Sequence, residues 1–282
     1  MRNKIAFIGV GNMASAIING MISVDNPERF DISNIILFDK LSAQTERFAA
    51  LGATVSNSIS DAADNADCIM LCVKPQNFPE ILPELSKVNN AAKKLYITIA
   101  AGITIDSVST ALGGAPVVRV LPNTPIFIGK GVSAICKNAN VNDEDFSFAC
   151  RIFASSSRLL VINESEMNRM ISVTSSSPAY VFLFIKAMFE GAASQGLLKS
   201  DLNPDGLSEN DLIAGICDTI IGAAELMKSS TKTPDDQIKT VASKGGTTEQ
   251  ALICLENYKF CEAISSAMQK CTDRADELGK VK

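Results

Sequence analysis

A glycine-rich turn near the N-terminus is the first feature of this sequence that predicts chemistry. The segment IAFIGVGNMA places Gly9 and Gly11 between an apolar run and a stretch of helical period, with Ala14 where a third glycine often stands. Gly9 permits a tight turn, and Gly11 leaves the backbone open to a pyrophosphate. The N–H groups of Asn12 and Met13 would bind that anion at the start of the helix. The turn therefore predicts a dinucleotide site.

An acidic residue at the end of the second apolar run bears on the cofactor. Asp39 follows this run, where a carboxylate can accept a hydrogen bond from the adenosine ribose and favours NADH over NADPH. Its spacing from Gly9 exceeds the usual ~20 residues because residues 25–34 form an insertion. A loop-capping aspartate is the alternative interpretation.

A third candidate segment, VKPQ, ends another apolar run. Val73 closes the run, and Pro75 starts a helix, so Lys74 is expected at the carboxyl edge of a sheet, where ligands of such folds bind. The alternative for Lys74 is a solvated loop cation.

Short apolar runs alternate with stretches of helical period from residue 4 to about residue 162. The runs cover residues 5–8, 35–38, 68–73, 96–99, 117–121 and 132–136. They are apolar nearly throughout, as expected for a parallel sheet that helices cover on both faces. The sequence therefore predicts an α/β protein whose residues 1–163 form a doubly wound, mainly parallel Rossmann domain.

The pattern becomes helical after about residue 163, which predicts an all-α domain over residues 164–282. Residues 178–198 are apolar but contain Lys186 and Glu190, so a buried helix is expected here and no membrane span. Residues 212–227 carry too few charges for a surface helix and are expected to pack against another subunit. Residues 199–210 contain a cluster of turn formers that predicts an exposed loop.

The composition of the sequence limits the kinds of partner that the protein is expected to bind. The net charge of −5 is spread along 282 residues without a basic cluster, which argues against nucleic acid and leaves small molecules. Met1 is followed directly by a strand pattern, with no room for a signal peptide, so a cytoplasmic protein without a membrane role is expected.

The histidine and cysteine content argues against further classes of enzyme and against a metal site. The sequence contains no histidine, which excludes the imidazole proton transfer of many hydroxyacid dehydrogenases. Its eight cysteines include no CxxC pair, so they are predicted to be buried, reduced thiols, and no metal site is expected.

Several segments together resemble pyrroline-5-carboxylate reductases, in order and spacing over nearly the whole chain. They are IGVGNMASAIINGM, Asn57, VKPQ at 73–76, AAGI at 100–103, RVLPNTP at 119–125, SSSPAYVFLFIKAM at 175–188 and VASKGGTTEQAL at 241–252. The resemblance implies a Rossmann domain followed by an all-helical dimerisation domain, in a homodimer or an oligomer of dimers. It also implies reduction of 1-pyrroline-5-carboxylate, a cyclic imino acid, to L-proline by NADPH or NADH in proline biosynthesis.

The resemblance also assigns site residues. The cofactor would meet Gly9, Gly11, Asn12, Met13, Asn57, Val73, Lys74, Pro75, Ala100, Ala101, Gly102, Asn123 and Thr124, in addition to Asp39, which is predicted from its position alone. The substrate would meet Ser176, Ser243, Gly245, Gly246, Thr247 and Thr248.

The segment SKGGTT suits an anionic substrate on physical grounds, because free N–H groups at a helix start bind a carboxylate without arginine. The hydroxyl of Thr248 is the catalytic candidate at the ring nitrogen, and an ordinary N-cap threonine is compatible with that role. A protonated imine accepts hydride readily, so a protein without histidine needs chiefly to orient its two ligands.

Two residues depart from the family pattern. Ser175 stands where the family usually has glycine, and Lys244 stands where it has proline. Serine resists a left-handed backbone, while Lys244 adds charge near an anionic substrate and loosens its loop. These departures keep open a non-catalytic, dinucleotide-binding regulator. A β-hydroxyacid dehydrogenase is less compatible, because no asparagine follows Lys186 on the expected first long helix of the second domain.

Overall fold

The computed structural model describes residues 3–280, which form two compact units. The first unit comprises Met1–Pro178 together with Gln269–Lys282, and the second comprises Ala179–Met268. The chain thus leaves the first unit and returns to it, which the sequence pattern does not indicate. The functional boundary after residue 163 stays a prediction.

An eight-stranded sheet forms the centre of the first unit, in the order β3-β2-β1-β4-β5-β6-β7-β8. The strands are β1 (Ile5–Ile8), β2 (Ile35–Phe38), β3 (Thr54–Val55), β4 (Cys68–Leu71), β5 (Leu95–Thr98), β6 (Val117–Leu121), β7 (Gly131–Lys137) and β8 (Ser157–Val161). All neighbouring strands are parallel except β6 and β7. The predicted doubly wound, mainly parallel fold is confirmed, and each of the six predicted runs overlaps a strand.

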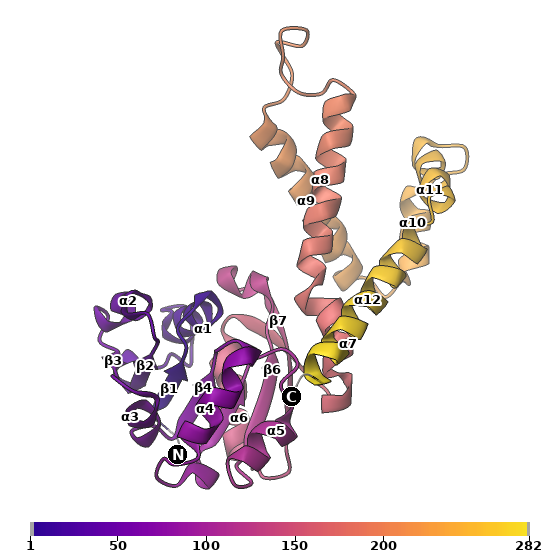
Figure 1. Cartoon of the computed structure of the whole chain (residues 1–282). Helices are drawn as coiled ribbons and strands as arrows, with labels where there is room; N and C mark the ends of the chain where they lie inside the picture. The colour runs from indigo at the N-terminus through magenta and orange to yellow at the C-terminus, as the bar shows by residue number, and fades with distance from the viewer. Residues whose placement is uncertain (1–2, 281–282) are drawn as a thin grey trace. The chain divides into compact units, whose positions relative to one another are not determined.

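Helices cover both faces of the sheet (Figure 1). Alternate side chains of β1 point to opposite faces: Ile5 and Phe7 belong to one buried cluster, Ala6 and Ile8 to the other. On the first face pack α1 (Asn12–Ile22) and α6 (Asp143–Ala154). The second face is covered by α3 (Ile59–Asp64), α4 (Phe78–Leu85) and α5 (Ile105–Ala111), while α2 (Glu46–Ala49) follows β2. The carboxyl ends of β1 and β4 thereby meet where the strand order reverses, the position of ligand sites in such sheets.

The last part of the first unit is tied to the sheet by a polar network. The buried Arg119 of β6 forms an ion pair with Glu164 at 3.2 Å and donates to Asn168 Oδ1 at 3.1 Å on α7 (Met167–Met170). Asn168 in turn donates to Asp276 Oδ1 at 2.8 Å, near the end of α12 (Phe260–Lys280). Ala275 beside it is buried. These contacts attach the C-terminal segment to the first unit.

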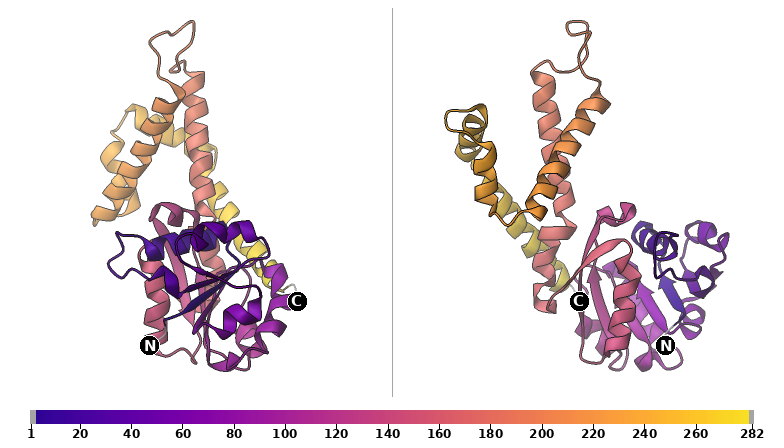
Figure 2. Two further views of the ribbon diagram at one scale, coloured as in Figure 1. Left: turned by 90° about the vertical axis from the view of Figure 1, so that its left-hand side faces the viewer. Right: turned by 180° about the vertical axis from the view of Figure 1, so that it is seen from behind.

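The second unit is helical, as predicted (Figure 2). It contains most of α8 (Ser177–Ser194), followed by α9 (Glu209–Ser229), α10 (Pro234–Val241), α11 (Thr247–Asn257) and the start of α12. The predicted loop between α8 and α9 is confirmed, and it is closed by reciprocal hydrogen bonds between Ser200 and Asn203.

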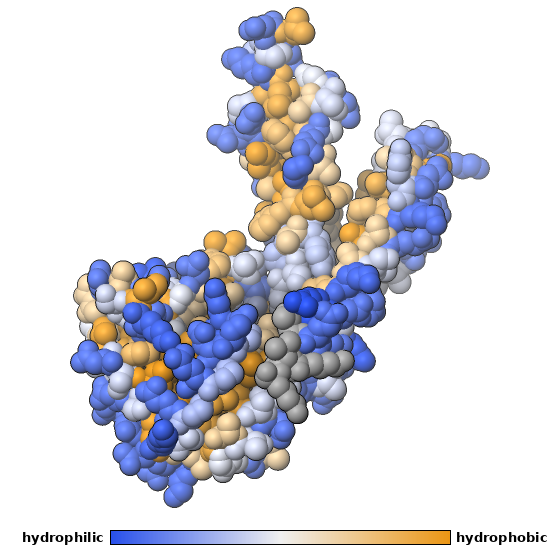
Figure 3. All heavy atoms as spheres, viewed as in Figure 1, coloured by the Kyte–Doolittle hydropathy of each residue, from blue (hydrophilic) through white to orange (hydrophobic). Residues whose placement is uncertain are grey.

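The helices of the second unit expose much apolar surface. No residue of α8 is buried, so the prediction of a buried helix at this position is wrong for the single chain. Figure 3 shows orange, apolar side chains over the helices of the second unit. Phe182 and Leu183 of α8 are each 65% exposed. By length and composition alone, residues 164–194 would suffice to cross a membrane, a test that core helices of soluble proteins also pass.

All eight cysteines are free thiols, as predicted. Cys68 and Cys136 are buried in the sheet, but Cys254 and Cys261 of the second unit are exposed, so the prediction of burial is wrong for this pair. Burial raises the pKa of the Cys136 thiol to about 12. Among residues 3–280 there is no group of three or more potential ligands placed to hold a metal ion.

Candidate active site

The turn between β1 and α1 has the geometry of a pyrophosphate site. Gly9 has a φ of +90°, and a Cβ there would lie 2.9 Å from Val73 Cγ1, so only glycine fits without strain. Gly11 is the N-cap of α1, and a Cβ there would meet nothing within 4 Å. The first N–H groups of α1 have no acceptor within the helix and are available to an anion in this open space.

 A cavity of about 460 Å³ lies beside this turn. A separate polar depression of about 410 Å³ lies around Phe30 and Arg151, and its lining includes none of the predicted site residues. The larger cavity is lined by Ile8, Gly9, Gly11, Phe38, Asp39, Lys40, Leu41, Ile59, Cys72, Val73, Lys74, Asn77 and Ile81. It therefore connects the glycine turn with the end of β2.

Asp39 is held by backbone groups at the edge of this cavity. Its Oδ2 accepts a hydrogen bond from Val10 N at 2.7 Å, and its Oδ1 accepts one from Leu41 N at 2.9 Å. The loop-capping interpretation of Asp39 therefore describes a real contact, and the same contact fixes a negative charge beside the cavity. The neighbouring Lys40 forms an ion pair with Glu80 at 3.0 Å.

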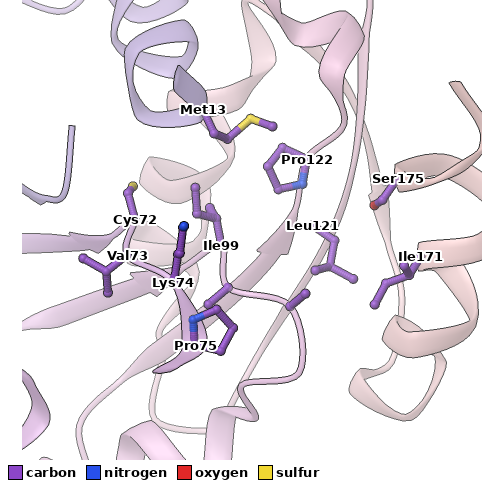
Figure 4. Close-up of a pocket in the computed structure, with 12 residues that line it drawn as sticks. Met13, Cys72, Val73, Lys74, Pro75, Ile99, Leu121, Pro122, Ile171 and Ser175 are labelled. Carbon is purple, nitrogen blue, oxygen red and sulfur yellow. The ribbon is translucent and has the colours of Figure 1, made fainter. Parts of the chain in front are cut away.

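A second cavity of about 300 Å³ continues from the first, because Cys72, Val73 and Lys74 line both. The rest of its wall consists of Met13, Pro75, Ile99, Ala100, Ala101, Leu121, Pro122, Ile171 and Ser175 (Figure 4). Burial raises the pKa of the Cys72 thiol, so this group stays neutral. The second cavity is mostly apolar, which suits a planar aromatic ring.

Several predicted site residues lie outside the linings of these two cavities. Asn57 is exposed after β3, Thr124 is exposed at the start of a 3₁₀ turn, and Gly102 lines a third cavity with Ala101 and Ile171. Asn123 is buried, and its amide donates to Thr174 O at 2.9 Å while accepting from Val132 N at 2.8 Å. Asn123 thus joins two backbone segments behind the second cavity.

Two further predicted residues have identifiable contacts. Asn12 begins α1 directly after the open position of Gly11. The Ser176 hydroxyl lies 3.2 Å from the Cys271 sulfur of α12.

The predicted substrate segment forms a tight turn in the second unit. Gly246 N donates to Ser243 O at 3.0 Å, with Lys244 and Gly245 between them and a φ of +76° at Gly245. A positive φ at the third residue is typical of a type II turn, in which proline is common at the second position. The turn leads into α11, whose N-cap is Gly246.

Some of the backbone N–H groups around the start of α11 have an acceptor within the chain, and others are available to a ligand. Glu249 reaches back and accepts from Gly245 N at 2.7 Å, while Thr247 and Thr248 form the first positions of the helix. Their N–H groups have no acceptor within the helix. The arrangement is compatible with the predicted carboxylate site.

The structure adds residues that the sequence analysis does not assign. Cys72 and Ile99 follow β4 and β5 at the carboxyl edge of the sheet, a position that their strands would have indicated. Ile171 comes from a π-helical turn, Ile171–Ser175, far along the chain. No local sequence signal marks it.

A glycine turn at a helix start, a fixed acid after β2 and two connected cavities together suit a dinucleotide. They define a Rossmann-type, nicotinamide-dependent oxidoreductase. In agreement, residues 4–102 match the family model described as NADP oxidoreductase, coenzyme F420-dependent, and residues 164–278 match the model for pyrroline-5-carboxylate reductase dimerisation. The chain belongs to the pyrroline-5-carboxylate reductase family.

Known relatives match the chain over its full length. It is 34% identical to the pyrroline-5-carboxylate reductase of Corynebacterium melassecola, covering 98% of both chains, and 32% identical to that of Escherichia coli, covering 99% of this chain and 100% of the relative. The solved pyrroline-5-carboxylate reductase of Coxiella burnetii has a TM-score of 0.86 at 28% identity, with 100% of both chains covered. The Plasmodium falciparum enzyme, solved with NADP bound, has a TM-score of 0.86 at 26% identity, with 99% of this chain and 100% of that chain covered.

Proposed function

We propose that this protein reduces 1-pyrroline-5-carboxylate to L-proline with NAD(P)H, the last step of proline biosynthesis. The observation that carries the proposal is the 34% identity over 98% of the chain to a pyrroline-5-carboxylate reductase. The two connected cavities support it, because together they offer room for both halves of a dinucleotide. Neither observation favours a non-catalytic regulator.

The chain's own groups bind and orient the cofactor. The N–H groups at the start of α1, beside Gly11, hold the pyrophosphate, and Val73, Lys74 and Pro75 border the passage between the two cavities. When bound, the reduced nicotinamide supplies the hydride. Ala100 and Ala101 lie along the apolar wall, which excludes water from the ring. The remaining predicted cofactor residues, Asn57, Gly102, Asn123 and Thr124, are proposed to support this site.

The turn before α11 receives the substrate. Free N–H groups of Thr247 and Thr248 bind its carboxylate, with Ser243, Gly245 and Gly246 shaping the loop. Ser176 of the first unit is a further proposed substrate-binding residue. The Thr248 hydroxyl holds the proton at the ring nitrogen. Because the imine carbon is already electrophilic, orientation by these groups replaces a strong general acid.

NADH is proposed as the preferred cofactor. The Asp39 carboxylate is fixed at the cavity edge, and the charge of the neighbouring Lys40 is offset by its ion pair with Glu80. The local charge therefore stays negative, which disfavours the additional phosphate of NADPH.

The protein is further proposed to act as a homodimer, or an oligomer of dimers, in the cytoplasm. Support comes from the match of residues 164–278 to a dimerisation model and from the apolar surface of the second unit. Burial of α8 against a second copy would remove that surface from water.

The test is oxidation of NADH and NADPH by the purified protein in the presence of chemically made pyrroline-5-carboxylate. We expect turnover that depends on the imine and forms proline. A control reaction with a 2-oxo or 3-hydroxy acid should give none, which separates this activity from that of a hydroxyacid dehydrogenase. Absence of turnover with both cofactors, in protein shown to be folded by circular dichroism, would sink the proposal in favour of a regulator.

A further inference from the structure

The hydroxyl of Ser175 is buried and has no hydrogen-bond partner within the described part of the chain. A buried polar group without a partner costs stability, so such a group in a cavity wall points to a ligand. Ser175 lines the second cavity opposite Val73 and Lys74, as Figure 4 shows.

The local backbone gives Ser175 this position without strain. It ends a π-helical turn, Ile171–Ser175, and is not among the described non-glycine residues with positive φ. The serine is therefore accommodated at this position. π-helical turns occur often at functional sites because they displace a side chain from the regular helix surface.

Neighbouring hydroxyls of the same turn behave differently. Ser172 Oγ donates to Arg169 O at 2.8 Å, and Thr174 Oγ1 donates to Met170 O at 3.0 Å. Thr174 is also held through its carbonyl by Asn123. These hydrogen bonds hold the backbone of the π-helical turn in place. Of its three hydroxyls, only that of Ser175 has no hydrogen-bond partner among the described residues.

The position of Ser175 indicates which part of a dinucleotide it meets. The first cavity begins at the glycine turn and the end of β2, and it joins the second cavity at Cys72, Val73 and Lys74. A cofactor that passes this junction places its nicotinamide in the second cavity, whose wall is otherwise largely apolar. The polar substituent of that ring is a carboxamide, which offers both a donor and an acceptor to a hydroxyl.

We propose that the Ser175 hydroxyl hydrogen-bonds to the carboxamide of the nicotinamide and so positions the ring. The inference rests on the proposed function only in assuming a nicotinamide dinucleotide. It assigns this serine a cofactor contact that a glycine at the same position cannot make through a side chain.

The experiment measures binding without substrate, using NADH and ADP-ribose as probes. ADP-ribose keeps the adenosine, pyrophosphate and second ribose but lacks the nicotinamide. We expect Ser175→Ala to weaken NADH binding about three- to tenfold, the range for one neutral hydrogen bond, and to leave ADP-ribose binding unchanged. Ser175→Gly should show the same selectivity if alanine impairs folding.

Ser172→Ala is the matched control, because it removes a hydroxyl from the same turn that points to the backbone and lines neither cavity. It should change neither affinity. Equal weakening of both probes by Ser175→Ala would make the serine a structural residue and overturn the proposal. So would unchanged NADH binding, including the case in which only the KM for the imine rises. Selective loss of NADH affinity in a protein without turnover would support the contact while refuting the proposed reaction.

Discussion

We expect the preference for NADH over NADPH to depend on one side chain, Asp39. Two unit charges ~4 Å apart repel by about 4 kcal/mol at an effective dielectric near 20, and exposure and salt reduce this value. A net preference for NADH of about 1–2 kcal/mol, or about five- to thirtyfold, is therefore expected. Asp39→Ser should improve NADPH relative to NADH by a similar factor, measured as the ratio of kcat/KM for the two cofactors.

The matched control for this charge change is Asp25→Ser, which removes an exposed carboxylate that lines neither cavity. It should leave the cofactor ratio as it is. A parent enzyme that already prefers NADPH tenfold or more, or a ratio that Asp39→Ser does not move, would show that this carboxylate acts only on Val10 and Leu41.

Thr248 provides the hydroxyl proposed to face the ring nitrogen of the substrate. Thr248→Ala removes that group and leaves the backbone donors of α11 in place. A hydrogen bond that matters in the transition state is worth about 1.5–3 kcal/mol, so kcat/KM for the imine should fall about ten- to a hundredfold.

Thr240→Ala is the control for loss of a threonine hydroxyl, because that hydroxyl bonds to Gln237 O at 2.6 Å within α10. Its kinetics should match those of the parent. Unchanged kinetics in Thr248→Ala would remove Thr248 from the mechanism.

At the scale of elements, the two glycines in the turn between β1 and α1 are expected to have different roles, Gly9 in stability and Gly11 in cofactor binding. Gly9→Ala forces a side chain into a φ of +90° and against Val73, so the free energy of unfolding should fall by about 1–3 kcal/mol. Gly11→Ala meets open space and should lower the free energy of unfolding by only about 0.5 kcal/mol, because alanine is a poorer N-cap than glycine. It should nevertheless weaken NADH binding by about tenfold, because the methyl group enters the space left for the pyrophosphate.

Thermal melts and NADH titrations of the two variants give the comparison. A loss of stability in Gly11→Ala as large as that in Gly9→Ala, or unaltered NADH affinity in Gly11→Ala, would contradict this division of roles.

The turn before α11 allows a stabilising substitution. Lys244 is exposed at the second position of a type II turn, where proline pre-forms the backbone. Lys244→Pro should therefore raise the free energy of unfolding by about 0.4–1 kcal/mol by restricting the unfolded chain. Chemical denaturation measures the change, and Lys228→Ala, which removes an exposed lysine near the end of α9, serves as a charge control. A lower stability in the proline variant would show that the turn needs a different backbone at this position.

The elements that could be predicted from sequence are those with a strong local pattern. Continuous apolar runs such as Ile35–Phe38 mark central strands because both of their faces are buried. β3 has only two residues and β8 begins with Ser157 and Arg158, so neither shows that pattern. The glycine turn was predictable for the same local reason. The cavity wall formed by Ile171 and Ser175 was not, because it depends on a π-helical turn brought to the sheet by tertiary contacts.

At the scale of the whole molecule, the proposed dimer follows from the apolar helices of the second unit. Phe182 and Leu183 of α8 are each 65% exposed in the single chain. We expect a dimer or larger oligomer at micromolar concentration, and Phe182→Asp should shift the equilibrium toward monomer by at least about tenfold, because it buries a charge in the interface. Light scattering over a dilution series measures this shift.

Val24→Asp is the control, since Val24 is 81% exposed in a loop of the first unit. It should leave the oligomer intact. A parent protein that is a stable monomer at micromolar concentration would refute the proposed dimer.

The division of the chain into two units could be predicted only in part from the sequence pattern. The helical half could be predicted from periodicity, but the return of residues 269–282 to the first unit could not. That return depends on single long-range contacts, such as the hydrogen bond from Asn168 to Asp276, which leave no mark on local composition.

The return of residues 269–282 to the first unit affects how the chain folds while it is being synthesised. A ribosome delivers the N-terminal strands first, and domains generally begin to fold as they emerge. The first unit nevertheless lacks Cys271, Arg274 and Ala275 of its third cavity until the entire second unit has been made. The nascent chain therefore presents its apolar helices to water before its oldest part is finished. The nucleotide-binding unit can therefore be completed only after the whole second unit has been translated, so premature termination after Met268 leaves the first unit without these residues.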